Sequence, residues 1–412
     1  MSDNIENDNN NTEFVEDSDD SNVFVYPNNY LSDSDESNSI YFNMKYIDEL
    51  LQELYTLLLN LESDDDITNL YRFVNNFLFE YDLKPNDAFK AMKCCSQYIS
   101  RYSSLIGYFN QHGIGCEMDD DQAFEIFSNS VKNNHQNHVD DNDNDDIRKL
   151  NEIILQYFYI LFLYEDVISY RRKNYNLHVK DAEKGDNVSQ YYVGNCYRYG
   201  TNIKQDYKMA IDWYLKSSEG GNIKAIYELG NCCDCGCGVT RDEKKAFELY
   251  LKSAEGGYKK AIKSVGFRYM YGNGTLKDEN KAFEWHLRAA KKGNGTSQYF
   301  VANHYFYYDE EKGFYWIRKA AISGNVDAQF ELAEYYLNNS INKNEGKAFK
   351  WYLKLANDYE SRAVYSVAKC YRDGIGIEKN SDEAATWFRK YTGEKDSFAL
   401  NDFLNSTGCY SI

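Results

Sequence analysis

The feature that most constrains this chain is the return of the same residue types at intervals close to 36 positions. A tryptophan-like position recurs with separations of 36, 36, 31, 35 and 36 residues. Two further positions keep step with it, one of them a small residue and the other a glycine or alanine. Periods between about 20 and 50 residues are typical of solenoids, in which each unit packs against its neighbours. The three registers are Trp213, Leu249, Trp285, Trp316, Trp351 and Trp387; Ala210, Ala246, Ala282, Gly313, Ala348 and Ala384; and Gly194, Gly230, Gly266, Ala302, Ala333 and Ala368.

Each unit has the pattern of two helices joined by a turn. Leu229 and Cys233 lie four positions apart, which places them on one stripe of a helix. Gly236 suits the left-handed backbone that ends a helix, and Asp242 is a good N-cap for the next one. Residues 245–254 carry apolar residues at three- and four-residue spacing. Only two prolines in 412 residues also favour long runs of helix.

This pattern resembles the Sel-1-like repeat, a relative of the tetratricopeptide repeat. The fullest copy of the repeat, from Ala261 to Gly293, departs from the family pattern at Val265 and His286, where leucine and tyrosine are usual. The resemblance implies an all-α fold, a right-handed α-solenoid of antiparallel helix-pair repeats of about 36 residues, with six units in residues 187–393. The fullest copy, from Ala261 to Gly293, contains Gly266, Tyr269, Gly272, Gly274, Asp278, Lys281, Ala282, Phe283, Trp285, Ala289 and Ala290.

The regions outside the clean repeats have distinct compositions. Residues 1–42 are acidic and polar, and we expect them to be disordered. Residues 43–62 contain an amphipathic pattern that predicts an N-terminal capping helix. Residues 63–186 are interpreted as degenerate helical repeats with an Asn/Asp-rich insert at 133–147. Residues 394–412 are expected to cap the C-terminal end.

The charge balance disfavours nucleic acid as a partner. The net charge is −19, and residues 1–40 hold seven Asp and four Glu without Lys or Arg. An acidic protein repels phosphate backbones. No secretory signal and no apolar run of about 20 residues is present, so we expect a cytoplasmic chain without membrane insertion. The acidic segment has two interpretations: an entropic solubiliser, or a docking tag phosphorylated at Ser18, Ser32 and Ser34.

Two clusters raise the question of a metal site. The cysteines between Cys232 and Cys237 could attract zinc, but Cys233 occupies a core position held elsewhere by tyrosine, and no second ligand pair follows. The acidic run from Asp141 to Glu152 matches a calcium loop at four positions, but Asp146 replaces the required glycine. We therefore predict no metal and no cofactor.

Signatures of common enzymes are also missing. The chain has no H-E-x-x-H, G-x-S-x-G or phosphate-loop motif, and the recurring G-x-G pairs are turns between helices. We therefore predict a protein without catalytic residues.

The resemblance instead points to the first helix of each unit, because related solenoids line their concave face with first-helix residues. The residue after the motif glycine is often asparagine, and a tyrosine commonly stands four positions before it. Asparagine can hydrogen-bond a peptide backbone through both amide groups, and tyrosine supplies anchoring area. The same tyrosines could instead pack between repeats. The predicted binding residues are Asn195, Asn231, Asn303, Tyr191, Tyr227, Tyr299 and Tyr365.

The resemblance thus implies a non-enzymatic scaffold or adaptor that holds an unidentified protein or peptide on its concave face. Two alternatives stay open. One is an enzyme or enzyme regulator with a site in the divergent region 43–186, and the other is a self-assembling structural component.

Overall fold

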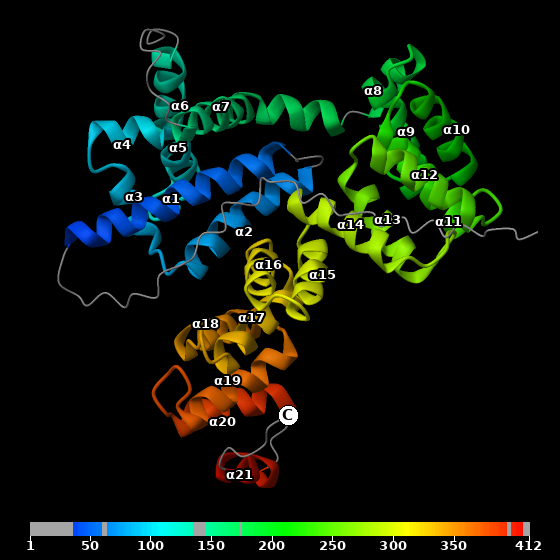
Figure 1. The fold of residues 1–412 in the computed structure, drawn as a ribbon. Helices are drawn as coiled ribbons and strands as arrows, with labels where there is room; N and C mark the ends of the chain where they lie inside the picture. The colour runs from blue at the N-terminus through cyan, green and yellow to red at the C-terminus, as the bar shows by residue number, and fades with distance from the viewer. Residues whose placement is uncertain (1–35, 60–63, 135–145, 174, 394–396, 407–412) are drawn as a thin grey trace, which may run out of the picture.

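The computed structural model describes residues 36–59, 64–134, 146–173, 175–393 and 397–406. These residues form 21 helices and no strand, so the all-α prediction is confirmed (Figure 1). Within these ranges no helix is long and apolar enough to cross a bilayer. The N-terminal helices are α1 (Glu36–Leu59), α2 (Asp64–Glu80), α3 (Pro85–Met92), α4 (Ser96–Arg101), α5 (Ser103–His112), α6 (Asp120–Asn134), α7 (Asp146–Lys173) and α8 (Tyr175–Glu183).

From α9 onward the helices follow one another in stacked pairs. The first helix of each pair packs on the second, which packs on the first helix of the next pair. The predicted solenoid of helix pairs is therefore confirmed. The first helices are α9 (Asn187–Tyr199), α11 (Ile223–Cys235), α13 (Lys259–Tyr271), α15 (Gly295–Phe306), α17 (Val326–Asn338) and α19 (Ser361–Asp373). The second helices are α10 (Tyr207–Glu219), α12 (Glu243–Glu255), α14 (Glu279–Lys291), α16 (Glu310–Ile322), α18 (Glu345–Asn357) and α20 (Ser381–Thr392), followed by α21 (Ser397–Asn405).

The sequence sets the helix ends at the repeat period. Asp242 caps α12 by accepting a hydrogen bond from the Lys245 amide at 2.9 Å, and the equivalent Asp278 caps α14. Such side chains satisfy amides that the first helical turn leaves unpaired. At the other end, Gly236 follows α11 with φ +70°, which favours glycine. The capping residues thus place each turn where the sequence pattern predicts it.

The glycine of the repeat motif lets the two helices of a pair approach closely. A Cβ atom on Gly230 would lie 2.9 Å from the ring of Tyr250 in the second helix. At Gly194 the corresponding distance to Tyr214 is 2.6 Å. Both tyrosines are buried, so their rings fill the space that the glycines leave. At Gly194 and Gly230 the absence of a side chain therefore leaves room for the tyrosine ring of the second helix.

The N-terminal helices build a separate core. Helix α1 packs against α2, α3 and the 28-residue helix α7, while α5 pairs with α6 and also contacts α7. Leu51, Leu54, Phe77, Phe109 and Phe127 are fully or almost fully buried in this core. The capping helix predicted for 43–62 corresponds in position to α1, which begins earlier and packs inside this unit. Residues 1–35 and 135–145, which hold most of the predicted tail and insert, lie outside the described residues.

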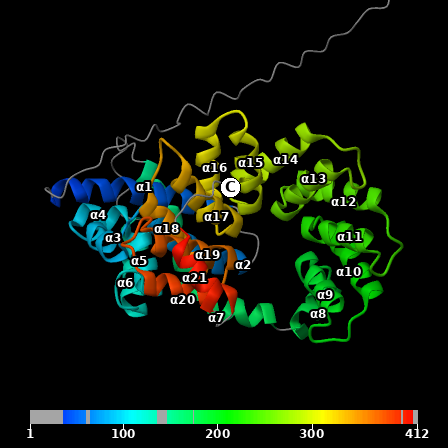
Figure 2. The same ribbon diagram turned by 90° about the horizontal axis from the view of Figure 1, so that it is seen from below.

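The chain turns back on itself. Helices α8 to α15 form an arc that leads from α7 round to α16, and α2 contacts α16 (Figure 2). Ile322 at the end of α16 belongs to the core of the N-terminal helices. The N-terminal helices therefore contact the middle repeats of the solenoid. The repeat pattern alone did not predict this contact.

Candidate functional site

The predicted binding residues lie on first helices, which form what we call the first-helix face. Six of the seven have partly buried side chains, and Tyr365 is 36% exposed. Their polar atoms and rings are engaged with other residues of the chain. The contacts with those partners determine which hydrogen-bonding groups of these residues stay available.

Asn195 and Asn231 each accept a hydrogen bond from a tyrosine of their own repeat. The hydroxyl of Tyr214 donates to Asn195 Oδ1, and that of Tyr250 donates to Asn231 Oδ1, both at 2.8 Å. Asn231 Nδ2 also donates to Glu228 Oε2 at 3.0 Å. An asparagine amide has two N–H donors and an oxygen with two lone pairs. The two asparagines therefore keep at least one N–H each beyond these bonds.

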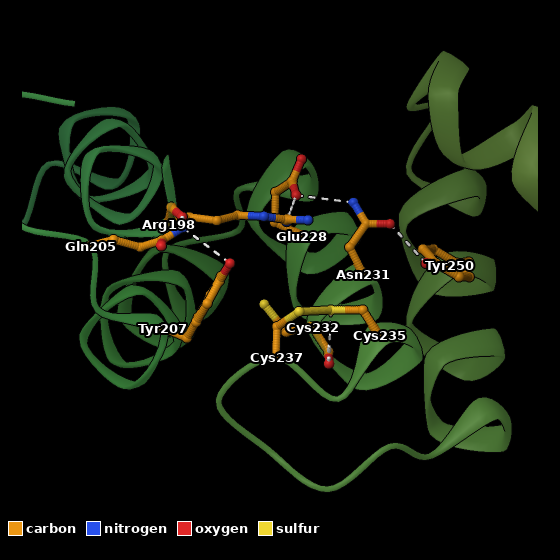
Figure 3. Close-up of a disulfide and its surroundings, with 9 residues drawn as sticks. All are labelled: Arg198, Gln205, Tyr207, Glu228, Asn231, Cys232, Cys235, Cys237 and Tyr250. Atoms are coloured by element: carbon orange, nitrogen blue, oxygen red, sulfur yellow. Dashed lines mark hydrogen bonds and ion pairs between the residues drawn. A yellow bond between two sulfur atoms is a disulfide. The ribbon is translucent and has the colours of Figure 1, made fainter. Parts of the chain in front are cut away.

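Charged residues join consecutive first helices along this face. Arg198 of α9 forms an ion pair with Glu228 of α11, whose side chain also contacts Asn231 (Figure 3). Arg268 of α13 pairs with Asp234 of α11 at 2.5 Å. The Arg198 and Glu228 side chains are only 16% and 10% exposed, so solvent screens this pair weakly. These pairs do not recur at the 36-residue spacing, which is why the repeat pattern did not reveal them.

The other predicted residues differ from repeat to repeat. The Tyr299 hydroxyl donates to Glu331 of the next repeat. Asn303 is half-buried in a unit where Ile317 replaces the tyrosine that elsewhere contacts the asparagine. The ring of Tyr365 lies 5.1 Å from Tyr391 and 5.9 Å from Phe403 of α21. The C-terminal helices thus cover part of the last predicted position.

The cysteine cluster is divided between the core and a disulfide. Cys232 and Cys233 are buried, whereas Cys235 and Cys237 are bonded to each other (Figure 3). Burial raises the pKa of Cys232 to about 11, which keeps its thiol protonated at neutral pH. Among the described residues no group of His, Cys, Asp and Glu side chains is arranged to hold a metal ion. The run Asp141–Asp145 lies outside the described residues.

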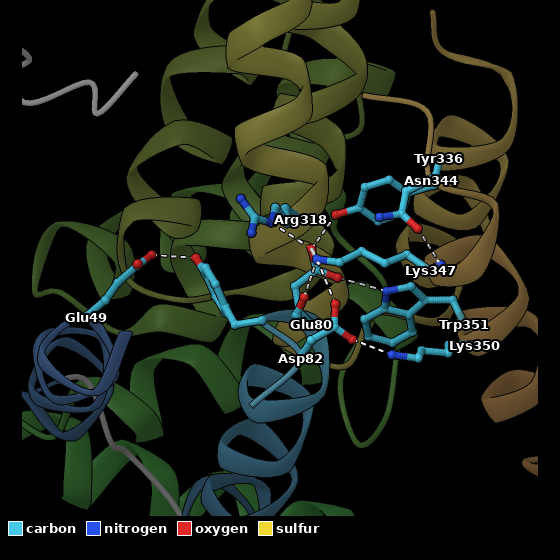
Figure 4. Close-up of polar contacts among 10 residues, drawn as sticks. Glu49, Glu80, Asp82, Arg318, Tyr336, Asn344, Lys347, Lys350 and Trp351 are labelled. Atoms are coloured by element: carbon cyan, nitrogen blue, oxygen red, sulfur yellow. Dashed lines mark hydrogen bonds and ion pairs between the residues drawn. The ribbon is translucent and has the colours of Figure 1, made fainter. Parts of the chain in front are cut away.

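A second polar site, which the sequence did not predict, joins α2 to the solenoid. We call it the Glu80 cluster; it consists of Glu80, Arg318, Tyr336, Lys347 and Trp351 (Figure 4). The Glu80 side chain has no exposed surface and lies 2.7 Å from Arg318 Nε. It also accepts hydrogen bonds from the Tyr336 hydroxyl at 2.5 Å and the Trp351 indole at 2.9 Å. Burial alone would raise the pKa of Glu80, but the two cations and the hydrogen bonds outweigh it and lower the pKa.

Polar and aromatic contacts extend this joint on both sides. Asn76 donates to the Ile322 carbonyl at 3.0 Å. The ring of Phe79 meets Trp351 edge-on at 4.8 Å. On α1, Glu53 pairs with Lys319 of α16 at 2.7 Å. The two members of each of these contacts are more than 200 positions apart in sequence. No local sequence pattern could therefore predict the contacts.

A pocket lies beside the Glu80 cluster, between α1, α2 and the segment from α14 to α16. Leu57, Phe77 and Ile322 line its apolar part. Its carboxylates have partners, because Glu49 accepts from the Tyr81 hydroxyl at 2.5 Å and Glu53 pairs with Lys319. Burial raises the pKa of Glu49. Of these two carboxylates, Glu53 thus joins the N-terminal helices to the solenoid, whereas Glu49 is bonded within the N-terminal region.

The sequence matches a known repeat family over more than half of its length. The family model described as Sel1 repeat matches residues 104–135, 187–222, 223–258, 260–294, 296–325, 326–358 and 361–390. These seven segments include the six predicted units and one in the N-terminal region. The chain is also similar to the chitin synthase regulator SKT5 of Saccharomyces cerevisiae, with 30% identity over 69 residues. That match covers 17% of this chain and 10% of the relative.

The solved structures to which this chain is similar are distant from it in sequence. A protective antigen of uropathogenic Escherichia coli that displays an SLR fold is 21% identical, with a TM-score of 0.49 and coverage of 82% of this chain and 79% of that chain. A Sel1 repeat protein from Oxalobacter formigenes is 22% identical, with a TM-score of 0.40 and coverage of 70% and 100%. An immunity protein of Pseudomonas aeruginosa, Pa5087, is 21% identical with a TM-score of 0.31 and coverage of 53% and 80%.

Proposed function

Because the chain belongs to the Sel1 repeat family, we propose that it is a non-enzymatic scaffold that binds a protein or peptide on its concave, first-helix face. One observation carries the proposal. Successive first helices present a partly exposed aromatic residue and an amide in the same register, as at Tyr191 with Asn195 and Tyr227 with Asn231. Solenoids use such extended surfaces to bind partners.

The chemistry of this face suits a peptide backbone. The hydroxyls of Tyr214 and Tyr250 hold the oxygens of Asn195 and Asn231, so each side chain has a fixed orientation. Remaining amide N–H groups donate to peptide carbonyls, and the neighbouring tyrosine rings supply contact area. A preorganised side chain loses little rotamer entropy on binding.

The proposal is tested by measuring how substitutions on the first-helix face change the affinity for a captured partner. We would purify partners from cell lysate on the full chain, identify the most abundant one, and measure its affinity for variants. Asn195→Asp keeps an oxygen for Tyr214 but removes the amide donors, and Asn231→Ala removes the second amide. We expect the dissociation constant of the doubly substituted chain to rise about tenfold or more, the equivalent of about 1.4 kcal/mol.

Glu248→Ala is the matched control, because Glu248 is exposed on the second helix α12. This variant should bind the partner as the unchanged chain does. Circular dichroism establishes that each variant keeps its helices. Equal binding by the asparagine variants and the unchanged chain would place the interaction elsewhere and overturn the proposal.

A further inference from the structure

Charge is segregated along the first-helix face. Helix α13 contains Lys259, Lys260, Lys263 and Arg268 but no acidic residue. Helix α15, the next first helix, contains no Asp, Glu, Lys or Arg. Helix α17 reverses the sign, because its charged residues are all acidic. Three consecutive first helices are thus positive, uncharged and negative in turn.

Part of the positive charge on α13 is left uncancelled. Arg268 is neutralised by Asp234 at 2.5 Å. Lys260 is exposed and Lys263 is half-buried, and neither has a carboxylate within 4.0 Å among the described residues. Burial lowers the pKa of Lys263, and the neighbouring Lys260 adds to the effect. A carboxylate placed beside these two ammonium groups would therefore be favourable.

The negative charge on α17 is also only partly cancelled. Asp327 pairs with Arg362 of the following repeat at 2.8 Å. Glu331 accepts a hydrogen bond from the Tyr299 hydroxyl, and Glu334 accepts one from the Tyr352 hydroxyl at 2.5 Å. Hydroxyl groups satisfy the hydrogen bonding of a carboxylate without neutralising its charge. Two net negative charges therefore stay on this helix.

The spacing of the helices sets the separation between the two charged regions. Neighbouring first helices touch through side chains, as when the Tyr227 hydroxyl meets Ser264 Oγ at 3.4 Å. Packed helices lie about 10 Å apart, so α13 and α17 are roughly 20 Å apart across α15. An extended peptide advances about 3.3 Å per residue and covers that distance in about six residues. Between the two regions lie Tyr299, Phe300 and Asn303, which are half-buried aromatic and amide side chains.

We propose that the first-helix face binds an extended peptide with an acidic side chain at α13 and a basic side chain at α17, about six residues apart. Lys260 and Lys263 pair with the acidic residue. Glu331 and Glu334 pair with the basic one. The part of the peptide between its acidic and its basic residue packs on Tyr299 and Phe300. This inference rests on the proposed function, because it specifies the charge pattern of the peptide that the same face binds.

The probe is a library of random peptides displayed on phage and selected on the immobilised full chain. Selected sequences should be enriched in Asp or Glu and in Lys or Arg at a separation of about six residues. For a synthetic selected peptide, Lys263→Glu should weaken binding about tenfold, and so should Glu331→Lys. A peptide with its two charges exchanged should bind best to the chain that carries both substitutions. Lys252→Glu, an exposed change on the second helix α12, should leave binding unchanged.

The outcomes separate this inference from the proposed function. Peptides that bind the first-helix face without the charge pattern, or that bind the reversed variants equally well, overturn the inference alone. If those same peptides lose affinity in Asn195→Asp/Asn231→Ala, or in Asn303→Ala on α15 between the two charged regions, the proposed function stands. A selection that retains no peptide on the unchanged chain overturns both.

Discussion

The indole of Trp351 in α18 donates a hydrogen bond to the carboxylate of Glu80 in α2 at 2.9 Å, although 271 positions separate the two residues. Glu80 is fully buried and also contacts Arg318 and Lys347. A buried carboxylate is tolerated only where cations and hydrogen-bond donors surround it. The solenoid supplies all of these groups, so this one side chain connects the N-terminal helices to its middle repeats.

Removing the charge of Glu80 should loosen the attachment of the N-terminal helices. Glu80→Gln leaves Arg318 and Lys347 without their common carboxylate, and losing one member of a buried pair costs about 3 to 5 kcal/mol. The measurement is hydrogen exchange of the α2 amides, because local opening reports the stability of one region. Lys350→Gln is the control, since its pair with Asp82 is about half exposed and is worth about 1 kcal/mol at most. Equal exchange in both variants would contradict the prediction.

The stability of the middle repeats should depend on pH through His286. Burial, together with nearby Lys263, lowers the pKa of His286 from 6.5 to about 4. Above pH 6.5 both folded and unfolded forms are neutral, so its contribution is complete. Between pH 6.5 and 4 the unfolded chain takes up the proton first, and stability falls by about 3 kcal/mol.

A substitution can isolate the contribution of His286 to stability between pH 6.5 and 4. His286→Phe keeps a ring against Gly266 but cannot titrate, so its unfolding free energy should vary less between pH 6.5 and 4. Urea titrations at several pH values would give the difference between the two chains. Carboxylates titrate in both, so parallel pH profiles would show that His286 is not responsible.

Adding one methyl group at the motif glycine should be costly. In Gly230→Ala the Cβ would lie 2.9 Å from two ring atoms of Tyr250. That ring is 2% exposed and its hydroxyl is bonded to Asn231, so it cannot move aside easily. We expect a loss of about 1 to 3 kcal/mol in thermal or urea unfolding.

A second glycine in a helix gives the opposite expectation. Gly346 in the first turn of α18 has room, because the nearest atom to an added Cβ would be 3.5 Å away. Gly346→Ala should therefore stabilise the protein by about 0.5 to 1 kcal/mol through the unfolded state. A loss of similar size in both variants would mean that close packing is not the cause.

The ion pair between the first two clean repeats should show strong coupling. Arg198→Met leaves the largely buried Glu228 carboxylate without its cation, while the Asn231 amide still donates to it at 3.0 Å, and we expect a cost of about 3 kcal/mol. The double variant Arg198→Met/Glu228→Gln removes both charges and should be more stable than Arg198→Met alone. A double-mutant cycle measured by urea unfolding gives the interaction energy. Additive losses would show that the pair does not interact.

Part of the candidate site could be predicted from sequence. The register placed Asn231 and Tyr227 on a first helix, where the structure has them partly exposed. It did not reveal that Tyr250 donates to Asn231 or that Arg198 reaches Glu228. Those contacts depend on side-chain directions across the helix pair and between repeats, which the spacing of residue types does not specify.

The sequence by itself determined the repeating helix pair, because each unit is held by contacts within about one repeat of the chain. Capping by Asp242 and the contact of Gly230 with Tyr250 are of this kind, and they recur at the period of the pattern. Only the tertiary structure decided that Glu80 meets Arg318 and Trp351. The curvature of a solenoid sums small rotations from every repeat, so the place where the chain meets itself depends on all the repeats between.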